Sequence, residues 1–343
     1  MLDLFIAYGF FLLKAITIAL AVLIPILIII NSSRQKNLQD KGQLTVKNLS
    51  KRYENMGTSL KGSQMNSKEY KKLIKQKNKE DKKQKKKLVK QKQSIYVLNF
   101  MGDVMATEVD KLKQEINAIL ASKTNCKEVV LKVESGGGAA YAYGLCAAEL
   151  KRLVDNKIKL TVCIDKVAAS GGYLMSCVAS KIIAAPWAVV GSIGVIAQIP
   201  NLHRLLKEKK IDFEMHTAGE FKRTLTMFGE NTEEGRKKFI SELEDLHEVF
   251  KDFVQENRPN INTKEVSTGE VWQGKKALEV GLIDDIKTSD DYLLKLSEKF
   301  NLYEIEYFEK KPLADRFAFA AQMFVDKTLM KIQDTLNKDR YIR

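Results

Sequence analysis

The chain has 343 residues, which suits about two domains of ordinary size. It carries 57 Lys+Arg against 43 Asp+Glu, and a formal net charge of +14 favours an anionic partner such as nucleic acid or lipid. The excess is confined to residues 31–92, which sum to +15, whereas residues 93–343 sum to −1. We therefore expect no nucleic-acid partner for the body of the protein, which at 45% hydrophobic residues is globular rather than disordered.

Residues 1–30 are predicted to form a membrane anchor. Residues 4–30 are apolar apart from Lys14, and at about 1.5 Å rise per residue a helix of this length exceeds a hydrocarbon core of roughly 30 Å. No small-x-small cleavage site follows, so the pattern indicates an uncleaved, single-pass helix. Lys14 is expected to snorkel towards the interface, and the alternative is a polar contact with a partner helix.

Residues 31–93 are predicted to form a lysine-rich tether. Residues 68–92 hold 13 lysines against three acids, a block that repels itself and is solvated and partly helical at best. It acts either as a spacer or by adhering to anionic lipid headgroups, and the two interpretations are compatible. RNA binding is disfavoured because few aromatic residues are interleaved for stacking. Cations follow the apolar span and none precedes it, so the positive-inside rule favours a cytoplasmic body.

The body from residue 94 predicts strands alternating with helices. Strands are expected at 94–100, 128–134, 159–165 and 211–217, and helices at 107–121 with Thr107 as N-cap, at 139–155, from 170, and at 232–258. A short helix leading into a strand is expected over 277–285, and an amphipathic helix over 313–336 that packs on a neighbour or lies on the bilayer. This order indicates an α/β fold with βαβ units on a mostly parallel sheet.

The four cysteines, Cys126, Cys146, Cys163 and Cys177, have no C-x-x-C spacing, and the chain has only three histidines. A zinc site or a disulfide framework is therefore disfavoured, and we expect no metal. Cys146, Cys163 and Cys177 stand in apolar runs and fit a reduced core.

Two glycine-containing segments stand where strands pass into helices. The run Glu-Ser-Gly-Gly-Gly at 134–138 lets backbone N–H groups face a ligand, as an oxyanion hole needs, although a plain tight turn explains it too. It lacks the Gly-Lys-Ser/Thr of a phosphate loop. The run Ala-Ala-Ser-Gly-Gly-Tyr at 168–173 places Ser170 at the start of a helix between small residues. Ser170 is therefore a nucleophile or an N-cap serine.

A nucleophilic serine needs a base. None of the histidines, His203, His216 and His247, stands in a glycine-rich or strand-end context, which disfavours a Ser-His-Asp triad. A lysine that is neutral near pH 7 is the alternative base. Lys222 follows a predicted strand and a glycine and stands beside Arg223, although its spacing alone also fits a surface charge.

Four motifs in order resemble the signal-peptide-peptidase (SppA) family of serine proteases over residues 94–300. They are the runs at 134–138, 165–173, 190–195 and 217–224, and the anchor and tether resemble the SohB-type members of that family. The resemblance implies a ClpP/crotonase-like spiral of ββα units. It implies Ser170 as nucleophile and Lys222 as base, with no cofactor. One departure is Gly136, which stands where the family usually has proline.

The resemblance also implies how the site works. Backbone N–H groups near Gly137 or Gly138 and at Gly171 would hold the oxyanion, and Ser192 would orient Lys222 unless it is a simple turn serine. The expected function is a serine endopeptidase that cleaves signal-peptide remnants or other apolar, unfolded peptides.

Assembly and location are expectations as well. Relatives of this fold form rings or domes, which implies a homo-oligomer, and Lys222 acts either within its own copy or on a neighbour. The expected location is the bacterial inner membrane. Family analogy often places the catalytic body outside the cytoplasm, against the charge argument. The competing functions are a non-catalytic membrane scaffold and, last, an acyl-CoA enzyme. The segment 301–343 is expected to add a strand before its amphipathic helix.

Overall fold

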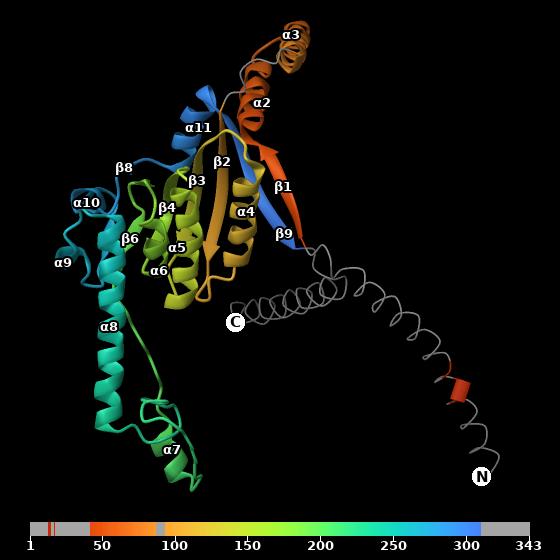
Figure 1. Ribbon diagram of the computed structural model, residues 1–343. Helices are drawn as coiled ribbons and strands as arrows, with labels where there is room; N and C mark the ends of the chain where they lie inside the picture. Colours follow the sequence, from red (N-terminus) through yellow and green to blue (C-terminus); the bar gives the residue numbers. More distant parts are fainter. Residues whose placement is uncertain (1–12, 15–16, 18–41, 87–92, 310–343) are drawn as a thin grey trace, which may run out of the picture. The chain divides into compact units, whose positions relative to one another are not determined.

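Figure 1 shows the computed structural model, which describes residues 13–14, 17, 42–86 and 93–309. The chain divides into two compact units, of which residues 45–306 form the larger. Nearly all of the predicted anchor and the whole predicted helix at 313–336 lie outside the described residues. Within the described ranges, no helix has both the length and the apolar character that crossing a membrane requires.

One mixed sheet organises the part of the chain that the structure describes. Its order is β1-β9-β2-β3-β4-β5-β8, and the pair β6 and β7 branches off it because β6 pairs with β4. The pairs from β9 through β8 are parallel, as is β4 with β6, whereas β6 and β7 are antiparallel. The strands are β1 (Gly42–Asn48), β2 (Ser94–Gly102), β3 (Cys126–Ser135), β4 (Lys159–Ala169), β5 (Lys181–Ala184), β6 (Val189–Gly191), β7 (Val271–Gln273), β8 (Asp285–Ile286) and β9 (Asn301–Glu309).

The helices connect these strands in the predicted alternation. They are α2 (Leu49–Gly62), α3 (Ser67–Lys86), α4 (Val109–Ser122), α5 (Ala140–Asp155), α6 (Gly171–Ser176), α7 (His203–Glu208), α8 (Glu233–Asn257), α9 (Thr263–Val266), α10 (Gly274–Glu279) and α11 (Ser289–Lys299). The predicted strands at 94–100, 128–134 and 159–165 and the helices at 139–155 and 232–258 are confirmed, as are the short helix and strand near 277–285 and the strand beyond residue 301. The α/β class of the fold is therefore confirmed.

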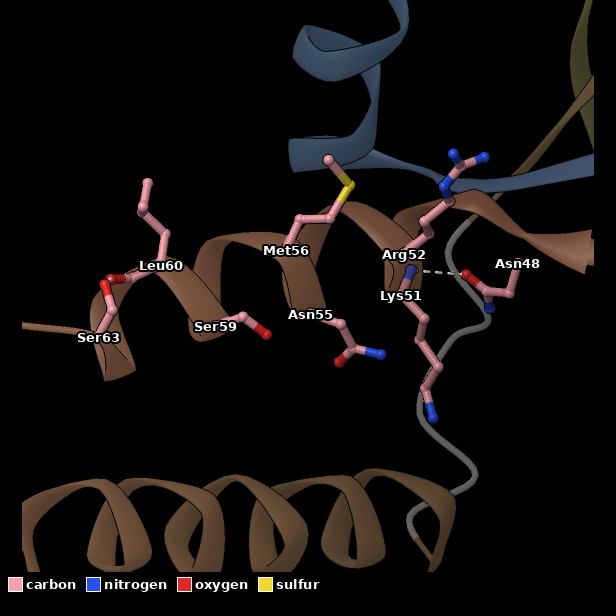
Figure 2. A pocket seen from close by; sticks show the side chains of 8 residues that line it. All are labelled: Asn48, Lys51, Arg52, Asn55, Met56, Ser59, Leu60 and Ser63. Carbon is pink, nitrogen blue, oxygen red and sulfur yellow. Dashed lines mark hydrogen bonds between the residues drawn. The ribbon is translucent and has the colours of Figure 1, made fainter. Parts of the chain in front are cut away.

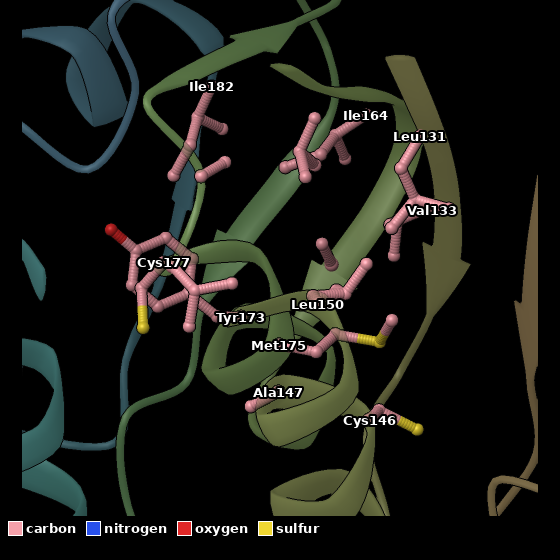
Figure 3. Close-up of a cluster of buried hydrophobic side chains, with 14 of the residues drawn as sticks. Leu131, Val133, Cys146, Ala147, Leu150, Ile164, Tyr173, Met175, Cys177 and Ile182 are labelled. Carbon is pink, nitrogen blue, oxygen red and sulfur yellow. The ribbon is translucent and has the colours of Figure 1, made fainter. Parts of the chain in front are cut away.

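Both faces of the sheet are buried. Successive side chains of a strand point to opposite faces, and each face packs against its own cluster of apolar residues. In β2, Leu98 and Phe100 join the large core cluster, whereas Ile95 and Val97 join a smaller one. The large cluster holds residues of α4, α5, α6 and α8, and the smaller one holds residues of α2 and α11. Figure 3 shows part of the large cluster, where side chains from β3, β4, α5 and α6 meet. This packing fixes the end of β4, from which the candidate site begins.

The cysteines lie where the sequence predicts them. All four are free, and Cys146, Cys163 and Cys177 are buried. Burial raises the pKa of each of these three thiols to about 12. They therefore stay protonated near neutral pH and are poor nucleophiles, as expected for core residues.

Three local predictions are wrong. The lysine-rich block is not partly helical at best, because its described residues 68–86 all lie in the continuous helix α3. Residues 211–217 are not a strand but an irregular, exposed segment in which Ile211 and Phe213 are about half exposed, so the alternation of apolar residues there has no sheet to pair with. Thr107 is not the N-cap of its helix, because its hydroxyl and its N–H both bind the Asp103 carboxylate at 2.7 and 2.9 Å. The helix α4 instead begins after Glu108, which makes no side-chain cap bond.

Candidate active site

Ser170 occupies a strained turn between β4 and α6. Its backbone has φ 51° and ψ −121°, a conformation that costs a non-glycine residue about 1–3 kcal/mol and is commonly held at functional sites. The turn is held because Ser170 N–H donates to Gly191 O at 2.7 Å, while Ser170 O accepts the N–H groups of Tyr173 and Leu174. This sharp strand-to-helix turn has the geometry that presents a serine hydroxyl at the end of a sheet.

The glycine run at 134–138 lies against this turn. A Cβ built on Gly137, which has φ 87°, would lie 2.7 Å from Gly171 N and 2.7 Å from Ser170 Cβ, so only glycine fits. A Cβ on Gly138 would lie 2.1 Å from Val104 O. The Gly137 N–H donates to Ser135 Oγ at 3.0 Å and is engaged. The N–H groups of Gly138 and Gly171 have no hydrogen-bond partner within the described residues, which leaves them as the donors for an oxyanion.

Ser170 opens into a cavity of about 880 Å³. Apart from Ser170 and Tyr141, every lining residue is apolar or glycine; the lining includes Val104, Gly138, Leu174, Ile196 and five residues of α8, Leu243, Leu246, Val249, Phe250 and Phe253. The sequence predicts the helix at 232–258, but no signal in it connects these residues with the site. Such a lining suits an apolar segment of substrate beside a single reactive hydroxyl.

A second hollow lies along α2 and is not a catalytic candidate. Figure 2 shows its side chains, which come from one helix and the residues on either side of it: Asn48, Lys51, Arg52, Asn55, Met56, Ser59, Leu60 and Ser63. It holds no acid to pair with a base and no glycine-built donors. In the described part of the chain, the Ser170 cavity alone combines a serine on a strained turn with unengaged backbone donors.

Ser192 lies beside the site. It follows β6, whose Gly191 pairs with Ala169 at the end of β4, so it stands one residue from the carbonyl that holds Ser170 N–H. Its own N–H donates to Glu270 O at 2.7 Å, and it too has a positive φ of 51°. The third motif therefore supports the serine turn through its backbone. The predicted contact of the Ser192 hydroxyl with Lys222 stays a prediction.

Lys222 is not brought to Ser170 within one copy of the chain. It lies in an exposed loop whose Phe221 ring is 5.6 Å from Lys238 Nζ, near the start of α8, whereas the cavity is lined by α8 from Leu243 onward. Lys222 is not among the residues that line the cavity. Figure 1 shows the loop around α7 at the end of α8 that lies away from the sheet. No histidine lines the cavity either.

Known proteins that are similar to this chain are peptidases. Residues 3–150 match the N-terminal model of peptidase family S49, and residues 152–303 match the model of peptidase family S49 itself. A protein named "Probable protease SohB" from Haemophilus influenzae is 44% identical over 331 residues, covering 93% of this chain and 94% of its own. The chain belongs to peptidase family S49. A protein of the same name from Buchnera aphidicola (subsp. Acyrthosiphon pisum) is 50% identical over 241 residues, covering 70% of this chain and 72% of its own.

This member of the family is also similar to solved structures. A variant of the 1510-N membrane-bound stomatin-specific protease superposes with a TM-score of 0.38 at 16% identity, covering 60% of this chain and 84% of its own.

The departure at Gly136 leads to a stability prediction. A Cβ there meets nothing within 4 Å, its φ is not positive, and its N–H has no partner within the described residues, so a proline fits. We expect Gly136→Pro to raise the free energy of unfolding by about 0.4–1 kcal/mol through the unfolded chain, with activity retained. Urea unfolding of Gly136→Pro beside Gly136→Ala measures this. A less stable proline variant would show that the turn needs freedom at this position.

Proposed function

We propose that this peptidase is a serine endopeptidase in which Ser170 is the nucleophile. The observation that carries the proposal is the strained turn that presents Ser170 beside the unengaged N–H groups of Gly138 and Gly171. The Ser170 oxygen would attack the peptide carbonyl and form an Oγ–C bond. The two N–H groups would stabilise the oxyanion, and the C–N bond would then break as the amine leaves with a proton. Water would release the acyl group in the reverse sequence.

We propose Lys222 as the base, supplied by a second copy of the chain. The separation of Lys222 from the Ser170 cavity within one copy supports an arrangement in trans. The loop that carries Lys222 and the segment before it expose large apolar side chains, among them Ile196, Ile199, Leu205, Ile211 and Phe213, each at least 40% exposed. Surfaces of this kind mark protein interfaces. In such a homo-oligomer Lys222 would take the Ser170 proton, and Ser192 would orient it.

The substrate we propose is an extended, apolar peptide, such as a signal-peptide remnant. The lining of the Ser170 cavity supports this, because it offers no charged group to a substrate side chain. We further propose that residues 1–30 anchor the enzyme in the bacterial inner membrane beside anionic lipid, with the body on the cytoplasmic side. The charge pattern of residues 31–92 supports that placement. The branch of β6 and β7 from the end of β4 supports a ClpP/crotonase-like spiral.

Labelling with an active-site-directed serine reagent tests the proposal. We expect a fluorophosphonate to modify Ser170, identified by mass spectrometry of the tryptic peptide, and peptide cleavage to fall in proportion to the labelled fraction. The extent of modification at Ser192 is the internal control against which modification at Ser170 is compared. Full labelling of Ser170 with undiminished cleavage would remove it as nucleophile. Absence of both labelling and cleavage would favour the non-catalytic scaffold.

A further inference from the structure

A chain of hydrogen bonds runs beneath the glycine loop. Gly137 N–H donates to Ser135 Oγ at 3.0 Å, Ser135 Oγ lies 2.6 Å from Tyr143 Oη, and Tyr143 O–H donates to Asp103 O at 2.7 Å. Because the Tyr143 proton is directed to Asp103, the Ser135 hydroxyl donates to Tyr143 and accepts from Gly137. Both hydroxyls of this hydrogen-bond chain therefore donate one bond and accept one, and all the bonds run in the same direction.

This hydrogen-bond chain is buried. Ser135 is 2% exposed and Tyr143 is fully buried, and burial raises the pKa of Tyr143, so its hydroxyl stays protonated as a donor. In a buried setting hydrogen-bonded hydroxyls specify geometry strongly, because an unpaired partner is costly. The Phe100 ring contacts the Tyr143 ring edge-on at 6.4 Å and holds it from the sheet side.

The Tyr143 ring also touches the second predicted oxyanion donor. A Cβ on Gly171 would lie 2.4 Å from Tyr143 Cγ, so the ring lies directly against the Gly171 backbone. A Cβ on Gly102 would lie 2.4 Å from Tyr143 Oη, so the last residue of β2 is held just as closely. One side chain of α5 therefore contacts three segments: the end of β2 at residues 102–103, the glycine loop and the serine turn.

We propose that Tyr143, acting through Ser135, is a positioning residue that fixes the spacing between the Gly138 and Gly171 N–H groups. The inference rests on the proposed function, because that spacing matters where an oxyanion forms. Tyr143 touches neither substrate nor the reacting atoms. Its hydroxyl sets the glycine loop through Gly137, and its ring sets the serine turn through Gly171. Misplacing one donor by about 1 Å weakens stabilisation of the transition state far more than it weakens substrate binding.

The test removes the Tyr143 hydroxyl and keeps the ring. We expect Tyr143→Phe to lower kcat about ten- to a hundredfold with KM changed less than about twofold. Affinity for a peptide aldehyde, which forms a tetrahedral adduct on Ser170, should fall by a similar factor. Ser135→Ala is the second variant, expected to act in the same direction, and the double variant should lose little more than either single one because the two hydroxyls act as one chain.

Tyr173→Phe is the matched control. Tyr173 is also fully buried, and its hydroxyl donates to Leu282 O at 3.0 Å, outside the glycine loop. Figure 3 shows that hydroxyl directed away from the other labelled side chains. Its loss should lower stability as Tyr143→Phe does while kcat stays near the wild-type value. Equal kcat in folded Tyr143→Phe, Ser135→Ala and Tyr173→Phe would overturn the proposal while leaving Ser170 labelling, and so the proposed function, intact.

A measurement that does not depend on catalysis separates the positioning role of Tyr143 from the proposed function. Amide hydrogen exchange at Gly137 should be faster in Tyr143→Phe and in Ser135→Ala than in Tyr173→Phe, because its acceptor is displaced or lost. Unchanged exchange at Gly137 in both variants would refute the hydrogen-bond chain, whether or not the protein cleaves peptides.

Discussion

An equimolar mixture of Ser170→Ala and Lys222→Ala proteins is expected to cleave an unstructured peptide, although neither protein does so alone. Each single variant should lose activity by about a thousandfold or more, because the nucleophile and its base act as a unit. In the mixture an intact Ser170 of one copy would meet an intact Lys222 of another. The physical reason is the position of Lys222 near the first turns of α8, remote from the cavity of its own copy.

The size of the rescue reports the arrangement. Random assembly of the two variants gives both intact groups at roughly a quarter of neighbouring pairs, so about a quarter of the wild-type rate is the expected ceiling. The measurement is initial rate against mixing ratio, with a maximum near equal amounts. The control is a mixture of Ser170→Ala with the double variant Ser170→Ala/Lys222→Ala, which should stay inactive. No rescue by the first mixture, with both single variants inactive and assembled, would place the lysine in cis.

The fold from residue 94 to residue 176 could be predicted from the sequence because its signals are local. Strands of apolar residues alternate there with helices of clear period, and the small residues around Ser170 mark the turn that the structure confirms. The register of β4 against β6, which brings Gly191 to Ser170, depends on contacts between distant segments and has no local signature. The position of Ser170 at the turn from strand to helix was therefore predictable, and the contact that holds the turn was not.

The sequence-based predictions are wrong where contacts between distant segments decide the local structure. The alternating residues at 211–217 have the pattern of a strand, yet none of the sheet's strands pairs with them in the described part of the chain. Thr107 has the chemistry of an N-cap, but its hydroxyl and its N–H both donate to the Asp103 carboxylate, which holds Thr107 in the turn before the helix. The Ser135–Tyr143 contact joins a strand end to a helix across the glycine loop, and no spacing rule marks it. Oxyanion donors near Gly137 or Gly138 were expected, and only the structure shows that Gly137 N–H is engaged.

The largest expected loss of stability comes from removing Arg258, at the end of α8. Its guanidinium forms two hydrogen bonds with the Asp284 carboxylate, at 2.7 and 2.9 Å, and a third with Gly281 O at 2.9 Å. The side chain is 12% exposed, and Asp284 also accepts the N–H of Ile182 at 2.7 Å. We expect Arg258→Met to lower the free energy of unfolding by roughly 3 kcal/mol at pH 7, because a half-buried carboxylate is left without its cation.

The Arg258–Asp284 pair also determines how the free energy of unfolding changes with pH. Burial alone would raise the pKa of Asp284, but the hydrogen bonds from Arg258 and Ile182 outweigh it and hold that pKa below its ordinary value. A lowered pKa contributes stability above the unfolded-state value of about 4, and this is lost as the pH falls through the folded-state value. Urea unfolding should therefore show a smaller difference between wild type and Arg258→Met at pH 3 than at pH 7.

Arg236→Met is the matched control for the arginine. Arg236 lies in the first turn of α8, is about half exposed and pairs with Glu233 at 3.3 Å. An exposed pair of this kind contributes little, so we expect a change within about 0.5 kcal/mol and no difference between the two pH values. Adding Asp284→Asn to Arg258→Met should recover part of the loss, since the uncompensated charge is then gone. If Arg258→Met destabilised the protein no more than Arg236→Met, the end of α8 would not depend on this ion pair, and another contact would have to hold the helix over the Ser170 cavity.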